Sequence, residues 1–189
     1  VCGGEAMDYA LAKDCQRLLP ATTLGNFYGP SEAADDAAWF EVDDTLCERS
    51  TVPIGRPIGN VRCHVLDEQM QLVPAGVIGE LYIGGVGLSP GYWEDPAKTA
   101  EAFIADPRRP GSQLYRTGDL VQRDCSGTLH YFGRNDDQIK IRGVRIEPRE
   151  IEKALLTVPG VLQAAATWYE ASSDHRGIVA GLVWRDGKS

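Results

Sequence analysis

The sequence has few basic side chains in its first half, no long apolar run and no recognisable cysteine pairs. Residues 1–100 carry 6 basic and 15 acidic side chains, so the chain has no electrostatic basis for binding nucleic acid non-specifically. No apolar run approaches the roughly 20 residues that span a bilayer, and the start shows neither an initiator Met nor a signal-peptide pattern. We therefore expect no nucleic acid and no membrane as partners.

Cysteine and histidine are too scattered to form a disulfide framework or a zinc site. The 5 cysteines are odd in number, no Cys-x-x-Cys pair occurs, and the 3 histidines stand alone. A structural zinc site needs closely spaced pairs of such ligands. Reduced thiols and a cytoplasmic location are the expectation.

What is present is typical of a globular chain, with 43% hydrophobic and 24% charged residues. The pattern of residues 5–19 predicts a helix with Ala6, Ala10, Leu11 and Leu18 on its apolar side. Residues 24–28 form a short apolar run that predicts a strand ending in a Gly-Pro turn. In residues 53–91, short apolar runs alternate with Pro and Gly, which favours a compact β-rich unit.

The second half contains a further set of predicted elements. Asp95 and Pro96 suit the cap and first position of a brief helix. Glu147-Pro148 opens another helix that ends near Thr157. The predicted strands after residue 53 are residues 61–66, 79–83, 114–123, 128–132, 139–142, 161–169 and 178–184. We expect an α+β chain with a boundary near Asp136, between a β-rich module and a small α+β module.

Residues 26–32 read Asn-Phe-Tyr-Gly-Pro-Ser-Glu, a tight turn that ends in a hydroxyl beside a carboxylate. The Ser31 hydroxyl could donate to a phosphate oxygen, and Tyr28 offers a flat face for a base. Glu32 could hold Mg2+, which takes hard oxygen ligands and accompanies phosphates. A strand-ending turn explains the same residues equally well, because Gly, Pro and Ser are turn formers.

Asp119 follows a glycine where a predicted strand meets a turn. A carboxylate there could accept hydrogen bonds from both ribose hydroxyls, although an ordinary turn Asp is an equal alternative. The glycine-rich residues 79–88 lack the Lys-Ser/Thr ending of a phosphate loop, and a glycine-rich strand turn is the favoured interpretation.

Basic side chains gather in the stretch after Asp136. A solvated face is the favoured interpretation of this composition. The alternative is a surface that approaches an anion or a phosphopantetheine-bearing partner. The residues concerned are Lys140, Arg142, Arg145, Arg149 and Lys153.

Taken together, these segments resemble the adenylation domains of nonribosomal peptide synthetases, in the superfamily that includes acyl-CoA synthetases and luciferases. Five motifs in the family's order carry the resemblance: residues 1–6, 26–32, 79–92, 115–120 and 133–152. In the second motif Ser31 stands where Thr is usual, a change that keeps the hydroxyl. The resemblance implies that residues 1–135 are the β-rich latter part of the large subdomain. Residues 136–189 would then begin the small α+β subdomain, with Asp136 as the hinge.

The resemblance implies an enzyme that joins an amino acid to ATP as aminoacyl-AMP and transfers it to a carrier-protein thiol. ATP and Mg2+ would be its cofactors. The partner would be a phosphopantetheine-bearing peptidyl carrier protein, expected in the same parent chain. The family's phosphate loop would precede the first residue, and its transition-state lysine would lie beyond the last. We therefore expect no catalytic residue within this stretch and little or no turnover by it alone.

Site residues follow from the resemblance by position. Glu32 would bind the metal. The nucleotide-binding residues would be Gly4, Glu5, Asn26, Tyr28, Gly29, Ser31, Asp119, Tyr131 and Arg134. The substrate pocket would include Val1, Gly3, Phe27, Asp35 and Asp36. The loop that faces the pantetheine channel in the thiolation state would contain Lys140, Arg142 and Gly143.

Two carboxylates in the pocket suggest a substrate with a basic side chain, because buried carboxylates are costly without a cation. The favoured alternative is that Asp35 or Asp36, or both, point to solvent. Two other functions remain open from the sequence: an acyl- or aryl-CoA ligase of the same superfamily, and a non-catalytic nucleotide-binding module.

Overall fold

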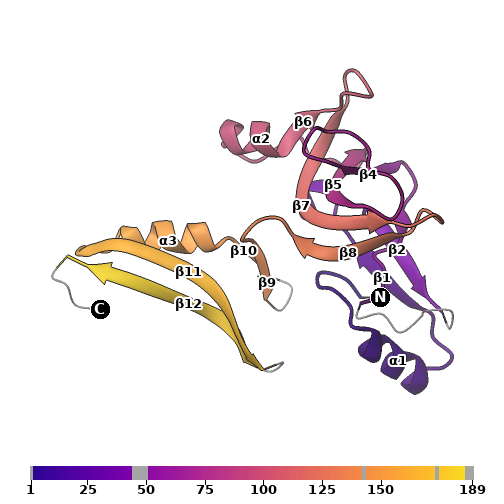
Figure 1. Ribbon diagram of the computed structural model, residues 1–189, viewed down its shortest axis with the longest axis horizontal. Coiled ribbons are helices and arrows are strands. Elements are labelled where there is room, and N and C mark those ends of the chain that lie inside the picture. Colours follow the sequence, from indigo (N-terminus) through magenta and orange to yellow (C-terminus); the bar gives the residue numbers. More distant parts are fainter. Residues whose placement is uncertain (1, 44–50, 142–143, 173–174, 186–189) are drawn as a thin grey trace. The chain divides into compact units, whose positions relative to one another are not determined.

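The computed structural model describes residues 2–43, 51–141, 144–172 and 175–185 (Figure 1). The chain divides into two compact units, Val1–Asn135 and Asp136–Ser189. Both units mix helices with strands and are dominated by strands, which confirms the predicted α+β class. Within the described ranges, no helix has the length and apolar character needed to cross a membrane.

The first unit opens with helix α1 (Tyr9–Leu18) and a three-stranded antiparallel sheet. Its strands, in spatial order, are β1 (Leu24–Tyr28), β2 (Ala38–Val42) and β3 (Arg56–Pro57). Strand β1 has the predicted bounds, because its apolar run ends at the Gly-Pro turn.

The predicted apolar face of α1 is wrong. Leu11 and Leu18 are 56% and 68% exposed, whereas Ala12 is 1% exposed. Ala12 packs in a small cluster with Met7, which precedes the helix, and with Val42 of β2. The small Ala side chain is therefore on the buried side of the helix, which the hydrophobicity of the leucines alone did not indicate.

A second antiparallel sheet forms the larger part of this unit. Its order is β4-β5-β7-β6, and β8 also pairs with β7. The strands are β4 (Val61–Leu66), β5 (Ile78–Gly85), β6 (Phe103–Ala105), β7 (Gln113–Arg123) and β8 (Leu129–Arg134). The glycine-rich stretch at residues 79–88 thus lies in β5 and the turn after it, as predicted, and no helix follows it directly.

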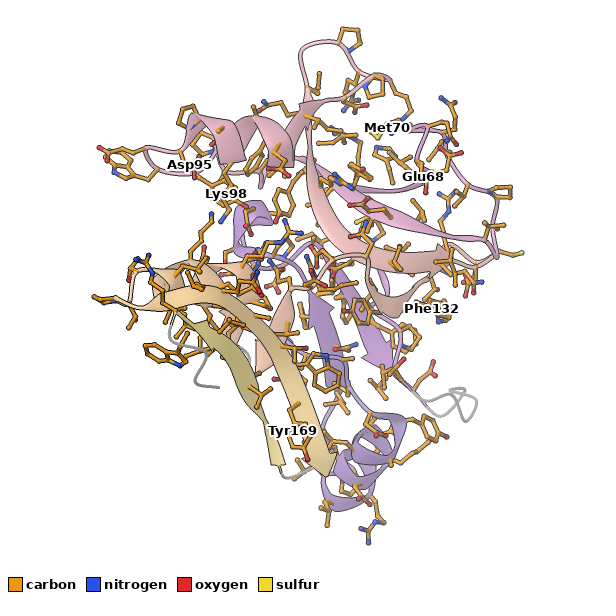
Figure 2. The ribbon with its side chains drawn as sticks, turned by 60° about the vertical axis from the view of Figure 1, so that its left-hand side comes forward. Glu68, Met70, Asp95, Lys98, Phe132 and Tyr169 are labelled. Atoms are coloured by element: carbon orange, nitrogen blue, oxygen red, sulfur yellow. The ribbon has the colours of Figure 1, made fainter. Side chains whose placement is uncertain are left out.

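Helix α2 (Pro96–Ala102) lies between β5 and β6 along the chain. The Asp95 carboxylate accepts a hydrogen bond from the Lys98 backbone N–H at 2.9 Å, and Pro96 occupies the first helical position. The labelled Asp95 lies at the start of this helix in Figure 2. The predicted helix is confirmed, since its cap depends only on neighbouring residues.

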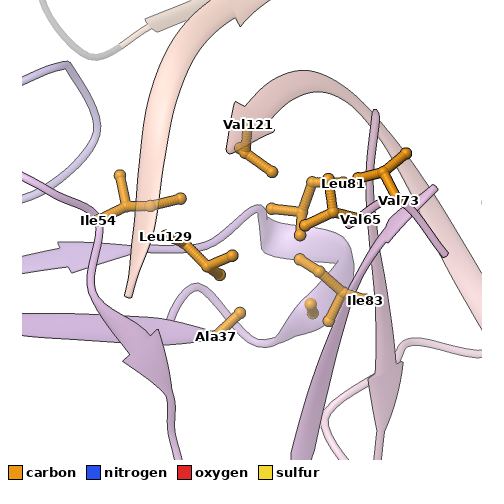
Figure 3. Close-up of a cluster of buried hydrophobic side chains, with 9 residues drawn as sticks. Ala37, Ile54, Val65, Val73, Leu81, Ile83, Val121 and Leu129 are labelled. Carbon is orange, nitrogen blue, oxygen red and sulfur yellow. The ribbon is translucent and has the colours of Figure 1, made fainter. Parts of the chain in front are cut away.

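The core of this unit lies against one face of the larger sheet (Figure 3). Leu81 and Ile83 are two positions apart on β5 and so lie on the same face of the sheet, and both are at most 1% exposed. They join Val65 of β4, Val121 of β7 and Leu129 of β8 in one cluster. Each such side chain stabilises the fold by about 1.5–3 kcal/mol, so the strand that carries Asp119 is firmly held.

Among its described residues, the second unit has two hairpins and one helix. The first hairpin pairs β9 (Ile139–Ile141) with β10 (Val144–Ile146), and the second pairs β11 (Val161–Ser172) with β12 (His175–Trp184). Helix α3 (Pro148–Leu156) packs on β11, where a Glu152 carboxylate oxygen accepts a hydrogen bond from the Ala166 N–H at 2.9 Å. Strand β10 is the element of this unit that the sequence did not predict.

Candidate functional site

The turn after β1 is folded tightly on itself. After Tyr28 the chain passes Gly29 and Pro30 into a short 3-10 helix, η1 (Ser31–Ala33). The Ala37 N–H donates to the Tyr28 carbonyl at 2.8 Å and closes the turn. A Cβ on Gly29 would lie 2.4 Å from the carbonyl oxygen of Asp35, so only glycine fits there without a backbone shift.

The segment after η1 holds two consecutive residues in left-handed conformations. Ala34 and Asp35 have φ values of 60° and 64°. Each such non-glycine residue costs about 1 kcal/mol or more, and this kind of strain gathers at functional sites. The Asp35 carboxylate lies 2.8 Å from the Ser31 hydroxyl, which donates to it.

Asp119 of β7 receives hydrogen bonds from two residues far from it along the chain. The Tyr28 hydroxyl donates to its Oδ2 at 2.5 Å, and Arg134 of β8 donates to its Oδ1 at 2.7 Å. The Arg134 and Asp119 side chains are 12% and 11% exposed and lie directly opposite each other across β7 and β8. The structure therefore brings together three of the predicted nucleotide-binding residues.

Burial affects the protonation of Tyr28. Burial raises the pKa of Tyr28 well above its usual value, and the negative Asp119 adds to the effect. Tyr28 therefore stays a hydrogen-bond donor at neutral pH. Asp119 as a whole residue is 8% exposed, and a buried carboxylate of this kind is tolerated because Arg134 and the tyrosine hydroxyl compensate its charge.

Thr117 contributes to this group, although the sequence did not predict it. The Asp119 N–H donates to the Thr117 hydroxyl oxygen at 3.0 Å, and that hydroxyl donates to the Leu81 carbonyl at 2.7 Å. Gly118, with φ of 75°, permits the bend between them. The only sequence signal was the position of Thr117 inside the motif of residues 115–120.

Glu32 is also buried, at 8% exposure, and is contacted by the loop between β5 and α2. The Tyr92 hydroxyl donates to its Oε1 at 2.6 Å. The Ser89 N–H donates to its backbone carbonyl at 2.9 Å. The sequence assigned no role to Tyr92, although it stands at the end of the motif of residues 79–92.

Three predicted residues near β1 and β8 lie in packed surroundings. Asn26 is 2% exposed, and its side-chain amide donates to the Pro53 carbonyl at 2.8 Å, which joins β1 to the segment before β3. Phe27 stacks on Trp39 of β2 with ring centroids 5.9 Å apart. Tyr131, like Tyr28, packs against the core of the larger sheet.

The segment before α1 runs beside β1. The Phe27 N–H donates to the Cys2 carbonyl at 2.8 Å, and a Cβ on Gly3 would lie 3.1 Å from the Phe27 carbonyl oxygen. Two predicted substrate-pocket residues therefore lie side by side. Gly4 and Glu5 are exposed, and Val1 lies outside the described residues.

Asp35 and Asp36 are both exposed. The case for a basic substrate rested on two buried carboxylates that would need a cation. Their exposure is in line with the solvent-facing alternative, and a basic substrate stays a prediction. The Asp35 carboxylate is instead engaged with Ser31.

The predicted hinge and loop residues belong to the second unit. The Asp136 carboxylate accepts a hydrogen bond from the Gln138 N–H at 3.1 Å, and Lys140 is exposed on β9. Arg145, Arg149 and Lys153 are exposed as well, as expected for a solvated face. Arg142 and Gly143 lie outside the described residues.

The residues of the turn fit a magnesium ion that is shared with a phosphate. Across the part of the chain that the structure describes, no group of three or more His, Cys, Asp or Glu side chains could hold a metal. Mg2+ is usually held by one or two carboxylates together with substrate phosphates, rather than by an all-protein cage. Glu32, a buried carboxylate that follows Ser31 in η1, meets that requirement.

Comparison with known proteins identifies relatives of this chain. Residues 1–93 match the family model described as AMP-binding enzyme. The chain is 44% identical over 162 residues to tyrocidine synthase 3 of Brevibacillus parabrevis, an alignment that covers 86% of this chain and 2% of that relative. It is 43% identical over 195 residues to enterobactin synthase component F of Escherichia coli, where the alignment covers 98% of this chain. The chain spans only 15% of the length of that second relative.

Solved structures are also similar to this chain. The chain matches holo-PA1221, a nonribosomal peptide synthetase protein with adenylation and PCP domains, with a TM-score of 0.86, 29% identity and coverage of 98% of this chain and 33% of that one. It also matches the Vibrio cholerae adenylation domain AlmE in complex with glycyl-adenosine-5'-phosphate. There the TM-score is 0.82 and the identity 30%, with coverage of 97% of this chain and 36% of that one.

Proposed function

The chain belongs to the AMP-binding enzymes, among the adenylation domains of nonribosomal peptide synthetases, and on this basis we propose that it contributes to activating an amino acid with ATP. The aminoacyl-AMP would then pass its aminoacyl group to a carrier-protein thiol. The curated relatives are peptide synthetases, which favours this function over that of a CoA ligase. The proposal names an amino acid as the substrate but does not specify its side chain.

The observation that carries the proposal is the convergence of Tyr28 and Arg134 on Asp119. A buried acidic residue that accepts hydrogen bonds from ribose hydroxyls is a common feature of nucleotide sites. Tyr28 and Arg134 orient the carboxylate through their hydrogen bonds, and a carboxylate has about four acceptor sites with which to bind a ribose as well. Ser31 at the start of η1 would donate to a phosphate of the same nucleotide.

Glu32 is the residue that would hold Mg2+ beside that phosphate. When bound, the ion would neutralise phosphate charge during attack by the substrate carboxylate. This chain's own contribution is to keep the Glu32 carboxylate buried, oriented and close in sequence to the Ser31 hydroxyl. Gly29 contributes by allowing the turn to close.

The two compact units are consistent with two subdomains of different roles. We infer that residues 1–135 are the latter part of the large adenylation subdomain and residues 136–189 the start of the small one, with Asp136 as the hinge. Lys140, Arg142 and Gly143 would face the carrier's phosphopantetheine arm during transfer. The solved relative PA1221 contains both adenylation and PCP domains, which supports a carrier domain as partner.

A cytoplasmic location is part of the same proposal. Cys2, Cys15, Cys63 and Cys125 are free thiols, as in proteins of a reducing compartment.

The test uses the full-length protein that carries this sequence. ATP binding is measured by calorimetry, and amino-acid-dependent exchange of pyrophosphate into ATP is measured across the common amino acids. Asp119→Asn should weaken ATP binding by about tenfold or more, since it removes a charged acceptor. Asp124→Asn is the matched control, because Asp124 is bonded within the β7–β8 turn. A protein that neither binds ATP nor catalyses exchange would refute the proposal.

A further inference from the structure

The buried Glu32 carboxylate is held by a residue 60 positions away in the sequence. The Tyr92 hydroxyl lies 2.6 Å from Glu32 Oε1, a short distance typical of a hydroxyl that donates to a charged carboxylate. Such charge-assisted bonds are about twice as strong as neutral ones. The Tyr92 hydroxyl therefore stabilises the Glu32 carboxylate and orients it.

Tyr92 is itself fixed before it reaches Glu32. Its backbone N–H donates to the Thr99 hydroxyl oxygen at 2.9 Å, and that hydroxyl donates to the Asp95 carbonyl at the cap of α2, at 2.7 Å. The Tyr92 ring meets Phe103 edge-on, with centroids 5.8 Å apart at 69°. The Lys98 ammonium, which Figure 2 shows on the same helix, lies 5.0 Å from the ring centroid.

The same loop also holds the backbone of Glu32. The Ser89 N–H donates to the Glu32 carbonyl at 2.9 Å, so one segment grips both the main chain and the side chain of this residue. The loop comes close enough to α2 that a Cβ on Gly91 would lie 2.4 Å from the Thr99 methyl. Gly91 also has φ of 138°, which a side chain would make costly.

We propose that Tyr92 is a positioning residue that orients the Glu32 carboxylate for a divalent cation shared with a bound nucleotide. This inference rests on the proposed function. Carboxylates that ligate metals are usually hydrogen-bonded by a second set of residues, and loss of such a partner weakens metal affinity by about 10- to 100-fold.

The decisive experiment compares Tyr92→Phe with the unsubstituted full-length protein. Calorimetry records ATP binding over a series of Mg2+ concentrations and again with excess EDTA. We expect the apparent Mg2+ affinity to fall about 10- to 100-fold, with the metal-free ATP affinity unchanged. The same change should appear as a higher Mg2+ requirement for pyrophosphate exchange, with little change in the KM for the amino acid.

Tyr82→Phe is the matched control. Tyr82 also has a glutamate partner, Glu80, with its hydroxyl 3.4 Å from the carboxylate, but that glutamate pairs with Arg116. The same loss of a phenolic hydroxyl there should leave the Mg2+ dependence unchanged. Equal losses in both variants would overturn the inference by showing a general effect on packing.

Two further variants keep the inference testable if Tyr92→Phe is unstable. Thr99→Val retains the Tyr92 hydroxyl but removes the acceptor of its backbone N–H, and it should weaken Mg2+ affinity several-fold. In a Glu32→Gln background, Tyr92→Phe should have no further effect on Mg2+ dependence. Normal Mg2+ dependence in both the Tyr92→Phe and the Thr99→Val variants would overturn this inference but leave the proposed function intact. An unsubstituted protein that binds no nucleotide overturns the proposed function and the inference with it.

Discussion

Tyr28→Phe removes a single hydroxyl from the group around Asp119 and leaves the ring in place. The lost bond is 2.5 Å long and partly buried, and its acceptor is a charged carboxylate. Hydrogen bonds to charged groups contribute about 1.5–3 kcal/mol, and Asp119 keeps its bond from Arg134. We therefore expect the free energy of unfolding to fall by about 2 kcal/mol. For a chain of this size, that loss corresponds to a decrease in Tm of roughly 4–8 °C.

The effect should depend on pH in a defined direction. The folded-state pKa of Tyr28 is raised above the value of 10.0 that an unperturbed tyrosine has. Below pH 10 the residue is protonated in both the folded and the unfolded state, so its contribution is complete. As the pH rises above about 10, the unfolded state loses the proton first, and the contribution declines until the folded pKa is passed. The difference between the unsubstituted chain and Tyr28→Phe should therefore shrink above about pH 10.

The assay is urea unfolding followed by circular dichroism at about pH 7, with repeats at intervals up to about pH 11. Tyr82→Phe again serves as the control, because its hydrogen bond is longer, at 3.4 Å, and should contribute less. Asp119→Asn combined with Tyr28→Phe completes a double-mutant cycle that isolates the pair. A loss below about 0.5 kcal/mol at neutral pH, or a difference that grows with pH, would refute the reasoning.

Two further predictions concern the turn and the thiols. Gly29→Ala should lower the free energy of unfolding by about 1–3 kcal/mol, because its methyl group would meet the Asp35 carbonyl; an unchanged urea midpoint would contradict the geometry of the turn. Burial raises the pKa of the Cys63 thiol to about 12, so in the folded chain at about pH 8 an alkylating reagent should modify the exposed Cys125 before Cys63. Mass spectrometry of partly labelled protein checks this order, and early labelling of Cys63 would count against it.

Much of the fold could be predicted because its determinants are local. The apolar run at residues 61–66 produced a strand with those bounds, and the Asp95-Pro96 cap produced α2. Strand β6 (Phe103–Ala105) was missed because three residues give too short a period to recognise. The apolar side of α1 was wrong because residues outside the helix determine which of its faces is buried.

For the candidate site, the sequence by itself determined which residue types were available and in what order the motifs occur. It placed Tyr28, Glu32 and Asp119 in or beside predicted turns where their side chains could bind a nucleotide, although Asp119 lies within β7 and not at the end of a strand. Only the tertiary structure decided their partners. Tyr28 and Asp119 are 91 residues apart, and Glu32 and Tyr92 are 60 apart. Short-range sequence patterns cannot predict such pairs, because the pairs form only when sheet pairing and loop packing bring distant segments into contact.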